Sequence, residues 1–406
     1  PMSSPTRGEL LRQQAAQTSG NLAGAVSLPT LASPSVARPA KDSPPILFIS
    51  YEFTYSPFSG NGVLARSLVK GLLSCGCRVL VICAQPAEEH AGRDHPIAAP
   101  EISAAQEGSL FVIPVPLPAA KGWRRLDDKA AHEEFATGAA ALANRAAAEE
   151  FGRAPKATIA IDWTGAAAWF AMSLEWPEWC VGGLPPCLYI NFRVYSSGIS
   201  PTAETPPSWY DEKEKAALGV ASSVLALSQR DRASLKALLG EQSATPVEVL
   251  LPCLRGDMQA LTSRTDEEHA EHLPPAAAAA AAGASRRRCF LACVVRLSEE
   301  KRPMLFAEIL EVMGAKHWQD RGLIPLLCGA SAEVGYASEV RSRVKAACPS
   351  AVILEQHLGP DEMAAVFNRT YINIHPCAYD AYGMSIVEAA AFGAPSLVNE
   401  TGIGAL

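Results

Sequence analysis

The sequence lacks the features of a membrane-spanning protein and of a nucleic-acid-binding protein. It has no run of about 18 or more apolar residues, the length that a membrane helix requires. The nearest candidate, residues 157–176, is interrupted by Asp162 and Glu175. Basic residues are in deficit, since 35 Lys and Arg stand against 42 Asp and Glu and give a net charge of −7. We therefore expect no transmembrane segment and no nucleic-acid partner, which would normally require a basic excess.

Metal-binding cysteine patterns are missing as well. The 11 cysteines are scattered, and the only close pairs are Cys75/Cys77 and Cys289/Cys293. Neither pair is followed by a second Cys or His pair at a zinc spacing. Buried free thiols are the better interpretation, because free cysteine behaves as a small hydrophobic residue. Thiols of this kind indicate a reducing compartment, so we expect an intracellular, cytoplasmic protein.

The N-terminal segment, residues 1–43, is rich in Ser, Ala, Pro and Thr and poor in acidic residues. It lacks the apolar core of a secretory signal. The weakly basic, Ser-rich composition fits a transit peptide that would direct the chain to a plastid or mitochondrion. It fits a disordered tail equally well, and both interpretations remain open.

Short apolar runs that alternate with helical patterns are present throughout residues 44–254. Strand–helix–strand units of this kind require parallel strands covered by helices, so we expect an N-terminal Rossmann-like domain. The strands are expected at 46–50, 78–83, 110–113, 158–161, 187–190, 223–227 and 247–251. The helices are expected at 63–74, 127–150, 212–218 and 230–239.

The composition changes at residues 255–288, which carry an acidic run, two prolines, seven consecutive alanines and three arginines. We interpret this segment as a low-complexity linker. The α/β pattern then restarts in residues 289–406, with strands expected at 290–295, 324–328, 352–354, 371–374 and 396–398 and helices at 303–313, 361–368 and 385–392. The predicted fold class is α/β, with two Rossmann-like doubly wound domains that face each other across a ligand-binding cleft.

A glycine-rich motif follows the first expected strand. Gly60-Asn61-Gly62 and the residues after it fit the pattern G-x-G-x-x-A and open a helix, where backbone amides can bind an anion. Two features disfavour a dinucleotide: the glycines come several residues after the strand, and the next strand is not followed by an acidic residue that would bind a ribose. An anion of another kind, or a merely flexible loop, remains open.

Two further segments carry charged groups at expected strand ends. Arg296 and Lys301 lie between a strand and a helix, where both cations could bind a diphosphate, although such residues often face solvent. Asp380 lies in a loop, and residues 383–385 can begin a helix with free amides. Glu388 falls within an apolar stretch of that helix, so it either binds a polar partner such as a pair of ligand hydroxyls or lies on the helix surface.

These three motifs together resemble the retaining GT-B glycosyltransferases of family 4, the glycosyl transferases group 1 type. The corresponding segments are residues 59–62, residues 295–301 and residues 380–395, in the family's order, and the match spans about residues 45–406. The chain has Asp380 where the family's E-x(7)-E signature begins with Glu. Family members continue past the glycines that match Gly402 and Gly404, so the resemblance implies that the second domain is incomplete at Leu406.

The resemblance implies a hexosyltransferase that moves a sugar from a nucleoside-diphosphate sugar, such as a UDP or GDP sugar, to an acceptor hydroxyl with retention of configuration. Arg296 and Lys301 would bind the diphosphate and act in catalysis with Asp380, which would hold the sugar hydroxyls. Glu388 would bind the ribose. Further donor contacts would come from residues at two helix starts: Gly60, Gly62, Gly383, Met384 and Ser385.

The resemblance makes residues 44–254 the acceptor-binding domain and places Asp162 and Trp163 on its acceptor side. His132 and Arg193 are weaker candidates, for which a structural or surface role is the better interpretation. For His375, a role in the donor site and a role as a packed polar residue remain equally open. The resemblance implies neither a metal nor another cofactor, and no D-x-D metal motif occurs. Two alternatives remain: a catalytically weak nucleotide-sugar-binding or scaffold protein of the same fold, and an NAD(P)-dependent oxidoreductase based on the Gly60 motif alone.

Overall fold

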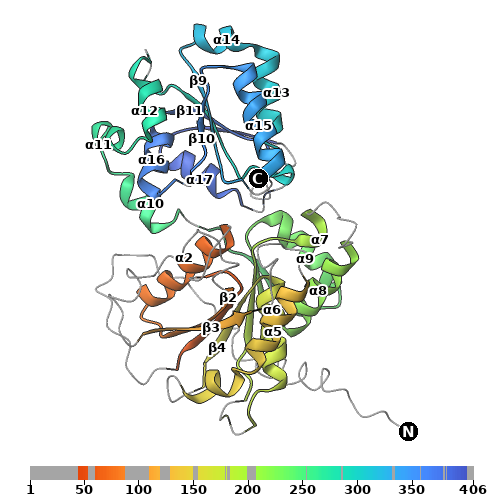
Figure 1. The fold of residues 1–406 in the computed structure, drawn as a ribbon. Helices are drawn as coiled ribbons and strands as arrows, with labels where there is room; N and C mark the ends of the chain where they lie inside the picture. Colours follow the sequence, from red (N-terminus) through yellow and green to blue (C-terminus); the bar gives the residue numbers. More distant parts are fainter. Residues whose placement is uncertain are drawn as a thin grey trace. The chain divides into compact units, whose positions relative to one another are not determined.

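The chain divides into two compact units, Pro1–Leu250 (unit 1) and Leu251–Leu406 (unit 2). The computed structural model (Figure 1) describes residues 44–53, 60–86, 109–118, 129–149, 154–178, 180, 183–198, 207–252, 254–284, 287–331, 334–356, 358–377, 380 and 382–399. The expected N-terminal tail and the glycines at 402 and 404 lie outside these residues. Each unit is described by itself.

Unit 1 is built on a parallel seven-stranded sheet in the order β3-β2-β1-β4-β5-β6-β7. The chain runs outward from β1 to β3, then returns to the other side of β1 and runs outward from β4 to β7. The point where this direction changes lies between β1 and β4, and ligands of doubly wound sheets bind at such points. The strands are β1 (Ile46–Ser50), β2 (Val79–Pro86), β3 (Leu110–Leu117), β4 (Ala157–Ile161), β5 (Cys187–Asn191), β6 (Ser223–Ala226) and β7 (Val247–Val249).

The helices of unit 1 confirm the predicted alternation and include two that the sequence pattern did not reveal, α6 and the four-residue α7. α6 is buried on several sides against β1, β4, β5, α5 and α8, so its sequence is apolar all round and shows no amphipathic period. The expected helix 127–150 is shorter in its described part, where α5 ends at Ala140 and a π-turn covers Arg145–Glu149. The helices are α2 (Gly60–Ser74), α5 (Lys129–Ala140), α6 (Asp162–Leu174), α7 (Tyr195–Gly198), α8 (Pro207–Val220) and α9 (Gln229–Leu239).

Unit 2 repeats the topology of unit 1 on a smaller scale. Its five described strands are parallel and have the order β10-β9-β8-β11-β12. The first strand, β8, is thus flanked by the second and the fourth, as β1 is in unit 1. The strands are β8 (Phe290–Val294), β9 (Ile324–Cys328), β10 (Val352–Leu354), β11 (Thr370–His375) and β12 (Ser396–Val398).

Helices cover both faces of the unit 2 sheet (Figure 1). Successive side chains of a strand point to opposite faces. Accordingly, Phe290, Ala292 and Val294 of β8 join one apolar core with α10, α12, α16 and α17, whereas Leu291 and Cys293 join a second core with α13, α14 and α15. The helices are α10 (Gly256–Leu261), α11 (Asp266–Glu271), α12 (Pro275–Ala282), α13 (Met304–Met313), α14 (Ala315–Asp320), α15 (Val334–Ala347), α16 (Pro360–Asn368) and α17 (Met384–Ala391), with a 3-10 turn, η2, at Glu299–Lys301.

Residues 255–288, which the sequence led us to interpret as a linker, do not form one. Their described part folds into α10, α11 and α12 and belongs to unit 2. In the alanine run, Ala277 and Ala281 are buried in the core of unit 2, together with Met258 and Leu261 of α10. Residues four apart lie on the same face of a helix, so two alanines are enough to pack this helix against the sheet.

None of the helices in the described ranges is long and apolar enough to cross a membrane.

Candidate functional site

The predicted donor residues lie on the segments that follow two neighbouring strands of unit 2. Lys301 ends η2, which follows β8, and Asp380 follows β11. β8 and β11 pair in parallel, so their carboxyl ends lie at the same edge of the sheet. Lys301 Nζ lies 2.9 Å from Asp380 Oδ2. The structure therefore brings together an ammonium and a carboxylate that the sequence separates widely.

Asp380 accepts hydrogen bonds on both carboxylate oxygens. Besides Lys301, Oδ2 contacts His375 Nε2 at 3.2 Å, and Oδ1 accepts the backbone N–H of Gly383 at 3.1 Å. Burial by itself raises the pKa of Asp380, but the Lys301 ammonium and the His375 hydrogen bond outweigh it and hold the pKa of this carboxyl well below its usual range. Asp380 is consequently a fixed negative charge at neutral pH.

A chain of contacts fixes this carboxylate from α17. Gly383 caps the start of the helix, just before Met384, and has φ 74°, in the left-handed region that favours glycine. A Cβ at this position would also lie 2.7 Å from Cδ1 of Ile386. Ser385 Oγ lies 3.1 Å from Nδ1 of His375. The Gly383 amide, expected to be free for a ligand, therefore bonds to Asp380, and Ser385 bonds to His375.

Arg296 and Lys301 share one acidic neighbour, Glu300. Arg296 Nη2 lies 3.3 Å from Glu300 Oε2, and Lys301 Nζ lies 3.7 Å from Glu300 Oε1. The Nε atom of Arg296 is buried and lacks a hydrogen-bond partner among the residues described. Both predicted cations thus lie in the same short segment, with donor capacity left on the guanidinium.

Glu388, expected either at a ligand or on a helix surface, is buried in the first turns of α17 and is 8% exposed. Its Oε1 lies 3.7 Å from Nε of Arg255, the residue that precedes α10. Burial raises the pKa of Glu388, with Arg255 opposing the change and Asp257 adding to it. A buried carboxylate with a single ion-pair contact retains acceptor capacity for a polar ligand.

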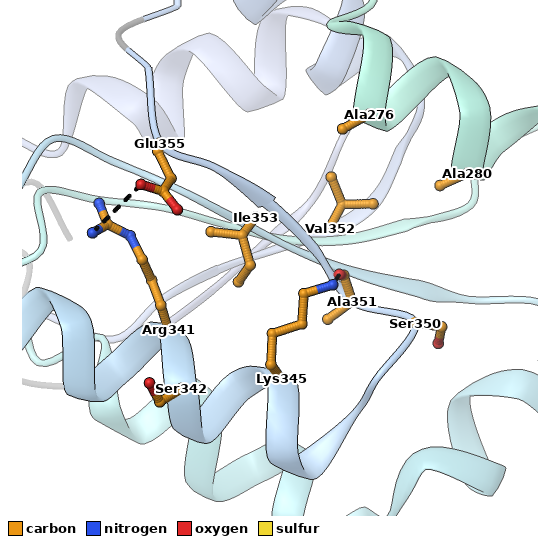
Figure 2. A pocket seen from close by; sticks show the side chains of 10 residues that line it. All are labelled: Ala276, Ala280, Arg341, Ser342, Lys345, Ser350, Ala351, Val352, Ile353 and Glu355. Atoms are coloured by element: carbon orange, nitrogen blue, oxygen red, sulfur yellow. Dashed lines mark hydrogen bonds and ion pairs between the residues drawn. The ribbon is translucent and has the colours of Figure 1, made fainter.

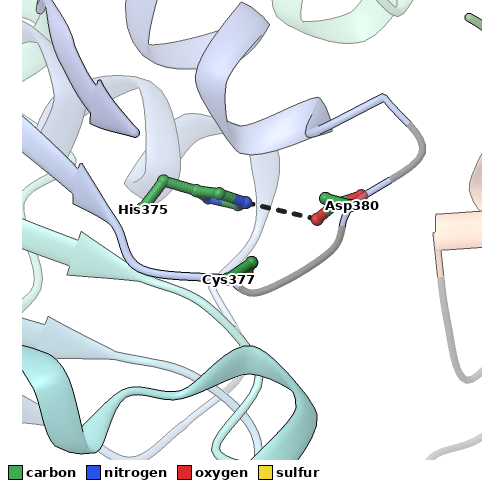
Figure 3. Close-up of side chains that lie close together, drawn as sticks. All are labelled: His375, Cys377 and Asp380. Atoms are coloured by element: carbon green, nitrogen blue, oxygen red, sulfur yellow. Dashed lines mark hydrogen bonds and ion pairs between the residues drawn. The ribbon is translucent and has the colours of Figure 1, made fainter. Parts of the chain in front are cut away.

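Three side chains near this point form a possible metal cluster. The ligand atoms of His375, Cys377 and Asp380 all lie within 4.8 Å of one another. Figure 3 shows the imidazole pointing at the carboxylate, with Cys377 between them on the connecting loop. No other group of this kind occurs among the described residues.

Unit 1 holds a second buried carboxylate at the corresponding place, directly after β4. Asp162 Oδ1 accepts the backbone N–H of Phe192 at 2.7 Å, and Oδ2 accepts Nδ2 of Asn61 at 2.8 Å and the hydroxyl of Tyr195 at 3.1 Å. Burial raises the pKa of Asp162 to about 7 against the lowering effect of these bonds. Its φ of 53° is in the left-handed region, which aspartate tolerates better than most residues.

The other predicted acceptor-side residues surround Asp162. Trp163 is 2% exposed and packs edge-on against His132, Tyr195 and the aromatic residues of α8. The guanidinium of Arg193 lies 5.6 Å from the centre of the Tyr195 ring. Gly60 is exposed at the start of α2 and Gly62 is buried in its first turn. Asp162, Trp163 and His132 therefore belong to the interior of unit 1, behind the start of α2.

A pocket of about 630 Å³ lies at the edge strand β10 of unit 2, between α12 and α15 (Figure 2). None of the predicted site residues lines it. Its cations already have acceptors: Lys345 donates to the carbonyl oxygen of Ala351 at 2.6 Å, and Arg341 donates to Ser331 Oγ at 2.6 Å. This pocket is therefore separate from the candidate donor site.

Several contacts of the candidate site residues were not found from the sequence. They are Glu300 beside the cations, Arg255 beside Glu388, and Asn61, Phe192 and Tyr195 beside Asp162. Glu300 lies within the Arg296–Lys301 motif and shows an i,i+4 spacing from Arg296, which was a usable signal. Arg255 lay in the segment interpreted as a linker. The pairing of Asn61 with Asp162 joins distant parts of the chain and has no local pattern.

Solved glycosyltransferases share this fold. Sucrose-phosphate synthase from Thermosynechococcus elongatus matches with a TM-score of 0.63 and 15% identity, over 89% of this chain and 82% of that chain. The catalytic domain of starch synthase IV from Arabidopsis thaliana, bound to ADP and acarbose, matches with a TM-score of 0.63 and 15% identity, over 89% and 84%. HepE from Anabaena, in complex with UDP-glucose, matches with a TM-score of 0.58 and 14% identity, over 88% and 80%.

These similarities establish the fold class, two parallel α/β units of the GT-B type. The predicted fold class is confirmed at this level. No family model matches the sequence, and no curated protein matches it. Membership of family 4 therefore stays a prediction, and the reaction is argued below from the residues.

Proposed function

We propose that this chain is a glycosyltransferase that moves a hexose from a nucleoside-diphosphate sugar to an acceptor hydroxyl. One observation supports this most strongly. Unit 2 places Arg296 and Lys301 after β8, and Asp380 after the neighbouring strand β11. Glu388 follows within α17. Cations for a diphosphate and carboxylates for hydroxyls are the groups that a sugar nucleotide requires, and proteins of the same fold bind ADP and UDP-glucose.

In this proposal, Lys301 and Arg296 bind the diphosphate. The ammonium of Lys301 now donates to Asp380, and in the proposed complex a diphosphate replaces the carboxylate as the acceptor of this N–H. The exchange frees Asp380 Oδ2 to accept a hydroxyl of the transferred sugar. His375 and the Gly383 amide keep the carboxylate in place during this exchange. Binding of the diphosphate and binding of the sugar are thereby linked through one ion pair.

Glu388 serves the nucleoside in the proposed complex. Its partly satisfied carboxylate can accept hydrogen bonds from two ribose hydroxyls, and Arg255 opposes the rise in its pKa that burial causes. Further amides for the anionic donor come from the start of α17, at Met384 and Ser385, and from the start of α2, at Gly60 and Gly62.

The chemical step is a departure of the diphosphate, stabilised by fixed positive charge. A positioned donor of this kind contributes about 2.7–4 kcal/mol to the transition state. We propose that attack occurs on the same face of the sugar, with the departing phosphate oxygen as base, so that configuration is retained. The mechanism requires no metal, because the two cations supply the charge. The acceptor is assigned to unit 1, where Asp162 accepts the side-chain amide of Asn61 at the start of α2 and Trp163 packs beside His132.

A donor screen tests the proposal. The full chain is incubated with UDP-, GDP- and ADP-sugars, with the free nucleoside diphosphates and with NAD. Binding is followed by thermal shift, turnover by release of the nucleoside diphosphate, and the product anomer by NMR. We expect stabilisation by one nucleoside diphosphate and an α-linked product from an α-linked donor. Stabilisation by NAD alone would contradict the proposal in favour of an oxidoreductase, and donor binding without turnover would favour a scaffold.

A further inference from the structure

The cluster of His375, Cys377 and Asp380 combines three kinds of metal ligand in one short segment of the chain (Figure 3). We propose that these residues form a Zn²⁺ site in which the metal replaces the ammonium of Lys301 and so blocks the donor site. The metal is an inhibitor here and takes no part in the transfer. The blocking effect rests on the proposed function, whereas the metal site itself does not.

The ligand set fits zinc in kind and in spacing. An imidazole nitrogen, a thiolate and a carboxylate oxygen are its usual ligands, at about 2.0–2.3 Å in a tetrahedral arrangement. Ligand atoms of such a site lie about 3.5 Å apart, as follows from those bond lengths. His375 Nε2 and Asp380 Oδ2 are already 3.2 Å apart, and Cys377 Sγ lies within 4.8 Å of both. Small side-chain rotations therefore suffice to complete three coordination positions.

The orientation of His375 is already the one that a metal ligand needs. Metal-binding histidines usually bond through their second ring nitrogen to a neighbour that fixes the ring. Here Nδ1 lies 3.1 Å from Ser385 Oγ, and the ring is 3% exposed. Beside a carboxylate that only accepts, Nε2 carries the proton and Ser385 donates to Nδ1. When a metal takes Nε2, the proton moves to Nδ1 and the same hydroxyl becomes the acceptor.

The charges of the site can be balanced by the metal. The Lys301 ammonium now neutralises Asp380. Zn²⁺ with one thiolate and one carboxylate is also neutral overall. As the Zn–S bond forms, the S–H bond of Cys377 breaks and its proton passes to solvent. Lys301 has a second acceptor nearby, because Glu300 Oε1 lies 3.7 Å from its Nζ. The ammonium can therefore leave Asp380 without losing an anionic neighbour.

Co²⁺ is the probe for this site, because a thiolate bound to Co²⁺ produces a charge-transfer absorption that free Co²⁺ lacks. The full chain, freed of metals with a chelator, is titrated with Co²⁺ and then with Zn²⁺. We expect one equivalent of Co²⁺ to give the band and Zn²⁺ to abolish it. The band should disappear in Cys377→Ser. It should remain in the matched control Cys75→Ser, since Cys75 is an exposed cysteine at the end of α2 in unit 1.

A second variant separates a metal site from a general effect on folding. Lys301→Met removes the competing ammonium and leaves the three ligands in place. Zn²⁺ affinity should rise about tenfold or more, since a unit charge within about 4 Å of the metal repels it strongly. A structural role for the cluster would not give this increase. Circular dichroism checks that each variant is folded, and if Cys377→Ser is not, Lys301→Met still decides.

The proposal is overturned if the parent chain gives no charge-transfer band, if the band survives in folded Cys377→Ser, or if Lys301→Met binds Zn²⁺ no more tightly than the parent. Calorimetric titration of the nucleoside diphosphate selected by the donor screen, with and without saturating Zn²⁺, then tests the blocking effect. We expect Zn²⁺ to weaken its binding. If the donor screen fails and one equivalent of Co²⁺ still binds through Cys377, the transferase function is wrong and the metal site stands.

Discussion

The two units place a carboxylate at the same topological position and give it opposite properties. Asp162 follows the fourth strand of unit 1, and Asp380 follows the fourth strand of unit 2, each beside the point where the strand order reverses. Asp162 is surrounded by neutral donors, namely an amide side chain, a backbone N–H and a phenol. Asp380 is paired with an ammonium and an imidazole. The partners, and not the fold, therefore decide which carboxylate is charged.

The difference appears in the pKa values. Burial raises the pKa of Asp162 to about 7, because the hydrogen bonds from Phe192 and Tyr195 offset desolvation only in part and two nearby carboxylates, Glu214 and Glu52, add to the rise. The pKa of Asp380 is lowered although this group is partly buried, because the Lys301 ammonium at 2.9 Å and the contacts with His375 together outweigh desolvation. Unit 1 thus holds a carboxyl that can be protonated near neutral pH, and unit 2 holds a permanent anion of the kind that binds sugar hydroxyls.

The strongest test of the charged site is the loss of Lys301. We expect Lys301→Ala to lower the turnover of the nucleotide sugar by about 10²–10³-fold, as the loss of one preorganised donor does elsewhere. The fold should remain, because Lys301 ends a short turn and His375 still bonds to Asp380. Turnover is measured by diphosphate release, with circular dichroism as the check on folding.

The matched control is Lys316→Ala on α14. This lysine is 87% exposed and pairs only across one helical turn with Asp320, at 3.5 Å. Its removal should leave turnover unchanged. Equal turnover in Lys301→Ala and the parent chain would remove Lys301 from the diphosphate site, and with it the contrast drawn between the two units.

Much of the fold was predictable because a buried parallel strand is a short run of apolar, β-branched residues between turns. The strands β1, β8 and β9 follow the expected bounds to within one residue. Two of the missed helices show no amphipathic period, by which a helix is usually recognised: α6 is apolar all round, and α12 is a run of alanine. The sequence analysis also missed α15, although its buried residues Ala337, Val340 and Val344 stand at helical spacings and were a usable signal.

The candidate site was predictable only in part, for a related reason. Arg296, Lys301, Asp380 and Glu388 stand in local motifs, and the structure places them on the segments after β8 and β11. Their pairings depend on which strands become neighbours, which local sequence does not encode. Arg255 is the clearest case, since it reaches Glu388 only because the expected linker folds onto unit 2.

The second test concerns Glu388, the other predicted donor-site carboxylate of unit 2, which lies near the Arg255 guanidinium and has no lysine partner in the part of the chain described. We expect Glu388→Ala to weaken binding of the nucleoside diphosphate by about 1–3 kcal/mol, the value of a hydrogen bond to a charged group. Isothermal titration measures this change. Glu311→Ala is the control, because Glu311 is an exposed partner of Arg343 on the outside of α13 and α15. Equal affinity in Glu388→Ala and the parent would exclude contact with the ribose.

The last test compares the two carboxylates directly, through the dependence of the free energy of unfolding on pH. The pKa of Asp162 is about 7 in the folded chain and near 3.8 when unperturbed, and that of Glu214, which accepts the Tyr195 amide, is about 7 against 4.5, in both cases because of burial. At a pH between the unfolded and the folded pKa, each group holds a proton in the folded chain that it releases in the unfolded chain. Its contribution to the free energy of unfolding is therefore complete below the unfolded pKa and is lost as pH rises through about 7.

Between pH 5 and pH 6, each of these groups should lower the free energy of unfolding by about 1.4 kcal/mol. Asp162→Asn and Glu214→Gln should each remove the contribution of one group to this decrease in the free energy of unfolding. Asp380→Asn should leave the slope in this range unchanged, because a carboxyl with a lowered pKa is ionised in both states above pH 5. Urea unfolding followed by tryptophan fluorescence measures the difference, since every tryptophan except Trp318 lies in unit 1. A slope that changes in Asp380→Asn and not in Asp162→Asn would reverse the roles of the two carboxylates.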